Sequence, residues 1–191
     1  MHSAMTMIET TIMLLSSTAA WNLACAQAPP TTQTAHWLTY QSRDLFFVVD
    51  RPSAWDYRTE EDSNEVVFQS GNLSVSVAVA NNDEGNTADQ FLEVNKSLLR
   101  QQCPAAEMRE EGKARVAGVP GAYFTMFCPG PRLPTIVRIS AAANYRKLFI
   151  FNVTVPSAEL PAFQADIDHM ARSFKASDGL PEGRAERMRA R

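Results

Sequence analysis

The segment Leu73-Ser74-Val75-Ser76-Val77-Ala78-Val79 alternates between an apolar and a small side chain at every step. Successive side chains of a β-strand point to opposite faces, so this pattern predicts a strand with one buried face. The second face carries only serine and alanine, which is typical of an antiparallel sheet that covers a core with one side. The segment therefore predicts a half-buried antiparallel strand, and the rest of the chain is interpreted outward from it.

Further runs of β-type residues lie on both sides of this segment. The runs 37–40 and 45–49 are separated by four residues, a spacing that predicts a hairpin. Pro52 ends the second run because it has no N–H for a ladder, and we expect Trp55 to pack on the core. The other predicted strands cover 65–69, 107–116, 122–128, 135–143 and 146–155.

Two amphipathic helices are expected among these strands. Thr87 and Gln90 have the spacing of a capping box, which predicts a helix that runs to about residue 101. Its expected apolar stripe consists of Phe91, Val94, Leu98 and Leu99. A second helix is expected over 159–174. Its stripe consists of Leu160, Phe163, Ile167, Met170 and Phe174.

The order of these elements predicts the fold class. Runs of strands joined by short turns, with only two helices, are typical of α+β proteins rather than of βαβ units. We therefore expect an antiparallel sheet of about six or seven strands flanked by two helices, in an α/β/α-type sandwich.

Composition and charge narrow the classes of partner. The chain has 191 residues, of which 45% are hydrophobic, enough for one domain with a substantial core. The formal net charge is -3, and no basic stripe stands out. A nucleic-acid partner is therefore not expected, since such proteins carry a clustered positive surface.

The first 28 residues have the features of an export signal. They contain no Lys or Arg, and an apolar stretch from Ile12 to Leu23 ends in Ala26-Gln27-Ala28. Small residues in this A-x-A pattern are typical of a signal-peptidase site, although a positive n-region is missing. We predict a signal peptide at 1–28, a linker at 29–35, a folded domain at 36–175 and a disordered charged tail at 176–191. The mature protein would be periplasmic or secreted.

Cys25 offers a second interpretation of the same segment. It follows Asn22-Leu23-Ala24, which loosely resembles a bacterial lipobox, with Asn22 in place of the usual aliphatic residue. In that case Cys25 carries a lipid, the protein is an outer-envelope lipoprotein, and the membrane becomes a partner.

Cys103 and Cys128 are the two cysteines that remain after cleavage. A single pair in an oxidising compartment predicts a disulfide bond. The alternative is two buried thiols, which behave as small apolar side chains.

Three segments resemble the PsbP-like superfamily. They are Phe47-Val48-Val49-Asp50-Arg51-Pro52-Ser53-Ala54-Trp55, the hairpin 116–122 and the terminal helix 165–174. The resemblance covers roughly 38–175 and implies an antiparallel sheet flanked by helices. It also implies a small exported protein of a group that consists mostly of non-enzymatic accessory or assembly factors. The group offers no shared catalytic residues to carry over.

Few residues point to catalysis or metal binding. The chain has three histidines, His2, His36 and His169, and none of the common hydrolase, zinc-peptidase, P-loop or dinucleotide motifs. Asp166 and His169 are three apart on the second helix and form a weak metal candidate, although zinc needs three or four ligands. We therefore expect no enzyme activity and no cofactor.

Aromatic and arginine residues provide the leading candidate for a binding surface. Such residues are enriched where proteins contact partners. The candidates, expected near one end of the sheet, are Phe46, Arg132, Arg138, Tyr145 and Arg146. The alternative is that they cover the second face of the sheet under a helix.

These observations support two hypotheses of function. The first is a non-catalytic accessory, assembly or protein-interaction module of the bacterial cell envelope. The second is a periplasmic carrier whose sheet and helices enclose a pocket for a small apolar ligand or lipid.

Overall fold

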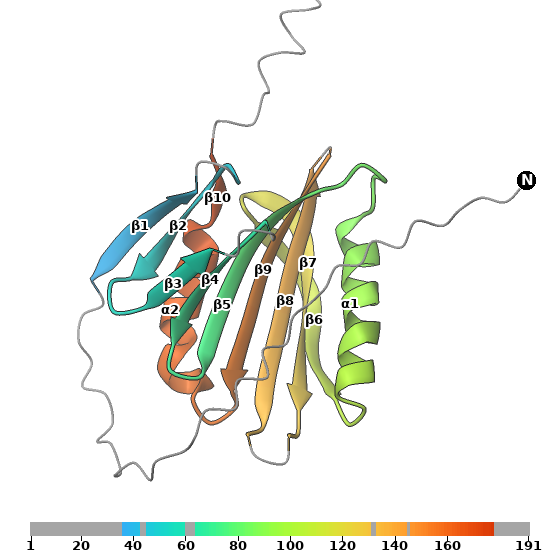
Figure 1. Ribbon diagram of the computed structural model, residues 1–191. Coiled ribbons are helices and arrows are strands. Elements are labelled where there is room, and N and C mark those ends of the chain that lie inside the picture. Colours follow the sequence, from blue (N-terminus) through green and yellow to red (C-terminus); the bar gives the residue numbers. More distant parts are fainter. Residues whose placement is uncertain (1–35, 43–44, 60–63, 131–132, 145, 178–191) are drawn as a thin grey trace, which may run out of the picture. The chain divides into compact units, whose positions relative to one another are not determined.

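The computed structural model describes residues 36–42, 45–59, 64–130, 133–144 and 146–177, all within the compact unit Thr34–Arg191 (Figure 1). The expected signal peptide, linker and Cys25 lie outside the described residues. The strands are β1 (Trp37–Ser42), β2 (Phe47–Pro52), β3 (Asp56–Thr59), β4 (Glu65–Ser70), β5 (Leu73–Asn81), β6 (Glu107–Val116), β7 (Val119–Cys128), β8 (Thr135–Asn144), β9 (Lys147–Pro156) and β10 (Lys175–Ala176). The helices are α1 (Ala88–Gln102) and α2 (Leu160–Ser173).

The strands form two antiparallel sheets. The larger sheet has seven strands in the order β3-β4-β5-β9-β8-β7-β6, and the smaller has three in the order β1-β2-β10. The α+β class and the large antiparallel sheet confirm the prediction. The hairpin at 37–49 also forms, but it joins β10 in a separate small sheet. The short strands β3 and β10 were not predicted, and β10 extends the fold into residues that the sequence analysis assigned to the tail.

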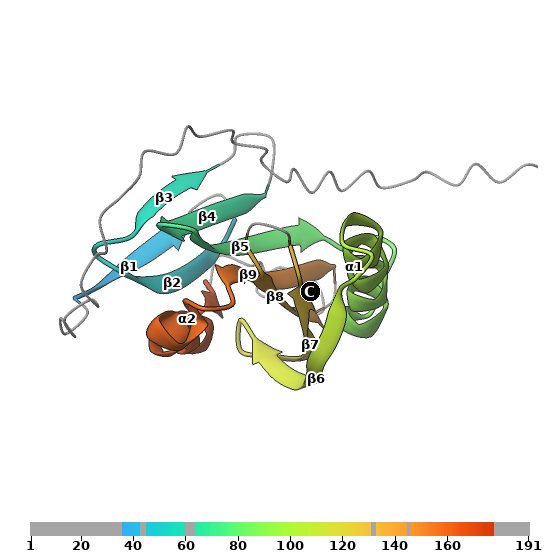
Figure 2. The same ribbon diagram turned by 90° about the horizontal axis from the view of Figure 1, so that it is seen from below.

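The seven-stranded sheet is covered on both faces (Figure 2). Helix α1 packs against β7 and β8 on one face, and α2 with the small sheet covers the other. The apolar side chains of β5 are buried in the core that contains α2. Trp55 belongs to the same core, and its ring makes an edge contact with Phe163 at 6.0 Å between centroids.

Helix α1 begins with the predicted capping box. The Thr87 hydroxyl accepts from the Gln90 amide, and the Gln90 side chain accepts from the Thr87 amide. The predicted apolar stripe was wrong at Val94, which is 60% exposed, whereas Leu92 is 3% exposed. Asn95 is also buried on the inner face and satisfies its amide by donating to the Phe91 carbonyl. Because a polar residue occupies this buried position, the apolar pattern alone did not indicate which face of the helix is buried.

A disulfide bond joins Cys103 and Cys128, as predicted. Cys103 is the C-cap of α1 and Cys128 is the last residue of β7, so the bond fixes the end of the helix to the sheet. On α2, the predicted stripe is confirmed by Ile167, Met170 and Phe174, which are all buried. Within the described ranges, neither helix combines the length and the apolar character needed to span a bilayer.

Candidate functional site

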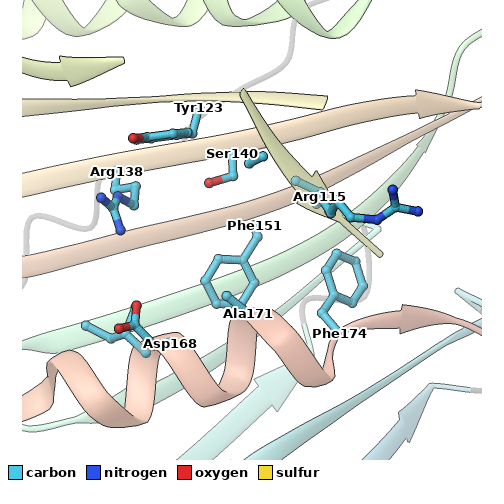
Figure 3. A pocket seen from close by; sticks show the side chains of 11 residues that line it. Arg115, Tyr123, Arg138, Ser140, Phe151, Asp168, Ala171 and Phe174 are labelled. Carbon is cyan, nitrogen blue, oxygen red and sulfur yellow. The ribbon is translucent and has the colours of Figure 1, made fainter. Parts of the chain in front are cut away.

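A pocket of about 220 Å³ lies between β6 and α2 (Figure 3). The strands β6 to β9 supply its floor and one wall, and α2 supplies the other wall. The pocket exists because α2 packs against β2 and β9, which leaves the neighbouring face of β7 and β8 without a helix above it.

The strand register determines which side chains face this pocket. Tyr123 on β7 lies directly opposite Ser140 on β8, and Ser140 lies opposite Phe151 on β9. Directly paired residues in an antiparallel sheet project to the same face. Thr125 and Arg138 form the next row on that face.

Arg138 is held by three neighbours. Its Nε donates to the Thr125 hydroxyl at 3.0 Å, and its Nη2 donates to Glu110 at 2.9 Å. Its guanidinium also lies 5.0 Å from the centre of the Tyr123 ring, within the range of a cation–π contact. The guanidinium is therefore fixed in orientation before any ligand arrives.

Glu110 links Arg138 to Tyr123. The Tyr123 hydroxyl donates to Glu110 at 2.6 Å. This hydrogen bond, together with the charge of Arg138, lowers the pKa of Glu110 below its usual value. The same hydrogen bond raises the pKa of Tyr123 because the phenol proton is shared with the carboxylate. Gly112 makes room for this ring, since a Cβ there would lie 3.2 Å from its Cε1 atom.

The wall formed by α2 is mainly apolar. Ile167 and Phe174 are buried and meet Phe151 from the sheet. Asp168 adds one carboxylate, which accepts a hydrogen bond from Gln164 at 2.8 Å. Arg115 also lines the pocket, but its guanidinium donates to the Gly118 carbonyl and points away from the pocket (Figure 3).

His169 belongs to a different cluster from the one that the sequence indicated. Its Nε2 lies 3.3 Å from the Asp50 carboxylate, and its ring stacks on Trp37 at 3.8 Å between centroids. Asp166, its expected partner, has a raised pKa because it is partly buried. No group of three or more His, Cys, Asp or Glu gathers around a common point in the described part of the chain. His169 therefore ties α2 to β2.

Of the residues expected to form one interaction surface, the three that the structure describes lie apart from one another. Arg138 lies in the middle of β8, whereas Arg146 is exposed beyond the far end of that strand. The six positions from Arg138 to Asn144 span roughly 20 Å. Phe46 lies in the β1–β2 turn, 38% exposed, and its carbonyl accepts from the Ser177 amide. Arg132 and Tyr145 lie outside the described residues.

The sequence analysis missed Glu110, Tyr123, Ser140 and Asp168. One signal for the set was present, because Arg138 and Ser140 alternate with Val137 and Ile139 along β8. That alternation places two polar groups on one face, but the register with β7 and the position of α2 are not encoded locally.

Strand β6 forms one edge of the seven-stranded sheet. It is ten residues long, and within the described part of the chain it pairs only with β7. Its exposed side chains are charged, and the register shifts between Met108 and Glu110. Glu111 contacts Lys96 at 2.7 Å and Lys113 contacts Asp89 at 3.1 Å, so side chains on α1 hold part of this edge.

Comparisons with known proteins identify the fold. Neither a protein-family model nor a curated protein matches the sequence. The solution structure of cyanobacterial PsbP (CyanoP) from a Synechocystis species matches with a TM-score of 0.53 at 16% identity, over 79% of this chain and 98% of that chain. A variant of the protein Mog1 matches with a TM-score of 0.53 at 10% identity, over 75% of this chain and 97% of that one.

LpqN of Mycobacterium tuberculosis, described as involved in cell envelope biogenesis, matches with a TM-score of 0.52 at 9% identity. The match covers 75% of this chain and 91% of LpqN. At these identities the likeness concerns the fold alone. The chain has a PsbP/Mog1-like fold, which confirms the resemblance noted in the sequence.

Proposed function

We propose that this chain is a non-catalytic, exported accessory protein that acts by binding other proteins of the cell envelope. The observation that carries this proposal is the free edge of β6. An edge strand presents unpaired backbone N–H and C=O groups, and an extended segment of a partner can add to it as a further strand.

The chemistry of β6 fits selective pairing. Charged side chains and a register shift protect an edge against indiscriminate association, because a wrong partner leaves charges unpaired. Here Glu107, Glu110 and Glu111 outnumber Arg109 in the first half, and Lys113 and Arg115 follow, so the net charge is negative in the first half and positive in the second. A partner strand with the opposite order of charges would pair in one orientation only.

Two observations support a location outside the cytoplasm. The Cys103–Cys128 bond persists in oxidising compartments and is rare in the cytosol. The fold is shared with LpqN, for which a role in cell envelope biogenesis is described.

A lipid carrier is less well supported. The pocket of about 220 Å³ is smaller than the roughly 300–1,000 Å³ of ordinary sites for drug-sized ligands. Its lining also includes charged residues, Arg138 and Asp168, which an acyl chain would remove from water without offering them a hydrogen bond.

Site-specific photo-crosslinking in the native host tests the proposal. A photo-reactive amino acid replaces Lys113 on β6 in one variant and Val94 on α1 in the matched control, since both side chains are exposed. We expect a discrete adduct with one envelope protein from position 113 and none from position 94. Equal adducts from both positions, or none from position 113, would contradict the proposal.

A further inference from the structure

The pocket between β6 and α2 contains a cation and an anion that do not pair with each other. Arg138 on β8 and Asp168 on α2 face the same space from opposite walls (Figure 3). Among the described residues, the ion pair of Arg138 is with Glu110 and none joins it to Asp168. The two charged groups are therefore placed to contact the two ends of one small molecule.

Arg138 still has hydrogen-bond donors to offer. A guanidinium has five N–H donors, and two of them are used by Thr125 and Glu110. Three remain, on a group that is already fixed in position. Binding to such a group loses little side-chain entropy, and a carboxylate is the partner that its planar donors match best.

Asp168 and Ser140 also keep hydrogen-bonding capacity. Gln164 donates to Oδ1 of Asp168, and Oδ2 has no hydrogen-bond partner in the described part of the chain. The hydroxyl of Ser140, in the row between Tyr123 and Phe151, likewise has none among the described residues. The pocket thus presents a free carboxylate oxygen on one wall and a free hydroxyl on its floor.

The rest of the pocket is apolar and small. Phe151, Ile167 and Phe174 are almost completely buried at its base, and the half-buried Ala114 and Ala171 leave space beside them. A volume of about 220 Å³ corresponds to roughly seven water molecules at about 30 Å³ each. The occupant is therefore a molecule smaller than an ordinary drug-sized ligand.

We propose that this pocket binds a free α-amino acid with an apolar side chain. The ammonium group contacts Asp168, the carboxylate contacts Arg138 and Ser140, and the side chain packs between Ala114 and Ala171. This assignment is independent of any partner at the edge of β6. Glu110 already neutralises part of the charge of Arg138, so the ammonium contact contributes more than the carboxylate contact.

Titration of the purified full chain with L-leucine, followed by NMR chemical shifts up to about 10 mM, tests the proposal. We expect saturable shifts at Ser140, Phe151 and Asp168. Isoamylamine lacks the carboxylate of leucine and 4-methylpentanoate lacks the ammonium, so both should bind at least about tenfold more weakly, as for the loss of one charged hydrogen bond. The dipeptide Leu-Gly distinguishes a peptide N-terminus from a free amino acid, and it should also bind more weakly.

Matched variants separate the site from general effects on the fold. Asp168→Asn should weaken leucine binding about tenfold or more, whereas Asp166→Asn, two residues earlier on α2 and outside the pocket, should leave it unchanged. Ala171→Leu fills the pocket and should abolish binding, with circular dichroism showing that the variant is folded.

Several results would overturn the proposal. They are no saturable shift with leucine, equal binding of isoamylamine or 4-methylpentanoate, tighter binding of Leu-Gly than of leucine, or equal effects of Asp166→Asn and Asp168→Asn. None of these results bears on crosslinking from β6, so the two proposals can fail separately.

Discussion

The two faces of the seven-stranded sheet are closed in different ways. On the α1 face, one helix lies over β7 and β8, and Leu92 packs with Phe124 and with small side chains such as Ala122 and Ala141. On the other face, α2 shares the sheet with the small sheet, and larger rings fill the core around Phe174. One helix covers the first face, whereas two elements share the second face and a pocket lies beside β6.

The two faces of the sheet also differ in the contacts that hold them. The α1 face is fixed at the end of its helix by a disulfide. The α2 face is held by ring contacts and by the His169–Asp50 pair, and its uncovered margin carries the charged pocket. The disulfide therefore secures the first face, and the charged pocket lies at the margin of the second.

The largest expected effect comes from Phe174, which is 1% exposed and contacts the rings of Phe47, Phe149 and Phe151. Phe174→Ala should lower the free energy of unfolding by about 3–5 kcal/mol, because a large ring leaves a cavity in the main core. Urea denaturation measures the change. Val94→Ala, at an exposed position on α1, should change stability by less than about 0.5 kcal/mol. A loss at Phe174 no larger than that at Val94 would show that the α2 core is assigned wrongly.

Removal of the disulfide should have the next largest effect. In the chain-entropy model, a bond that closes 25 residues stabilises by about 3–4 kcal/mol. The double variant Cys103→Ser, Cys128→Ser should lose stability by this amount, and hydrogen exchange should rise first in the last turn of α1. Equal denaturation midpoints with and without a reductant would contradict the prediction that the bond stabilises the α1 face.

Loss of the α1 N-cap should have a smaller effect. Thr87→Ala removes the side-chain acceptor for the Gln90 amide and should cost about 1 kcal/mol. Thr87→Asn retains an acceptor at the same position and serves as the control. Equal losses in both variants would mean that the cap itself contributes nothing.

The smallest expected effect is a pH-dependent gain in stability when Asp166 is replaced by asparagine. Partial burial raises its pKa in the folded protein, so the charged form is disfavoured there and ionisation at neutral pH opposes folding. Asp166→Asn should therefore be slightly more stable than the native chain at neutral pH. The difference should disappear as the pH falls below the ordinary pKa of 3.8, where both states are protonated. Chemical denaturation at pH 7 and pH 3 checks this sign, and a difference that grows in acid would refute it.

Much of the fold could be predicted because its signals are local. The alternation in β5, the capping box at Thr87 and the stripe on α2 each follow from residues that are close in sequence. Strand β3, Asp-Tyr-Arg-Thr, has no such signal because it is a short edge strand whose side chains are mostly exposed. The prediction that Val94 is buried was wrong because a buried asparagine, Asn95, occupies a position that the apolar pattern assigns to solvent.

The candidate site could be predicted only in part. Arg138 was singled out from its residue type alone. Its relation to Tyr123, Ser140 and Asp168 depends on the register of β7 against β8 and on where α2 crosses the sheet. These are contacts between residues far apart in sequence, and no periodicity within a single segment determines them.

We propose above all that this protein works outside the cytoplasm, with Cys103 and Cys128 joined in a disulfide bond. An intact mass of the protein from its native host, before and after reduction and alkylation, tests this claim most directly. We predict a chain that begins at Pro29 and takes up two alkyl groups only after reduction. A chain that retains residues 1–28 and is alkylated without reduction would contradict the claim.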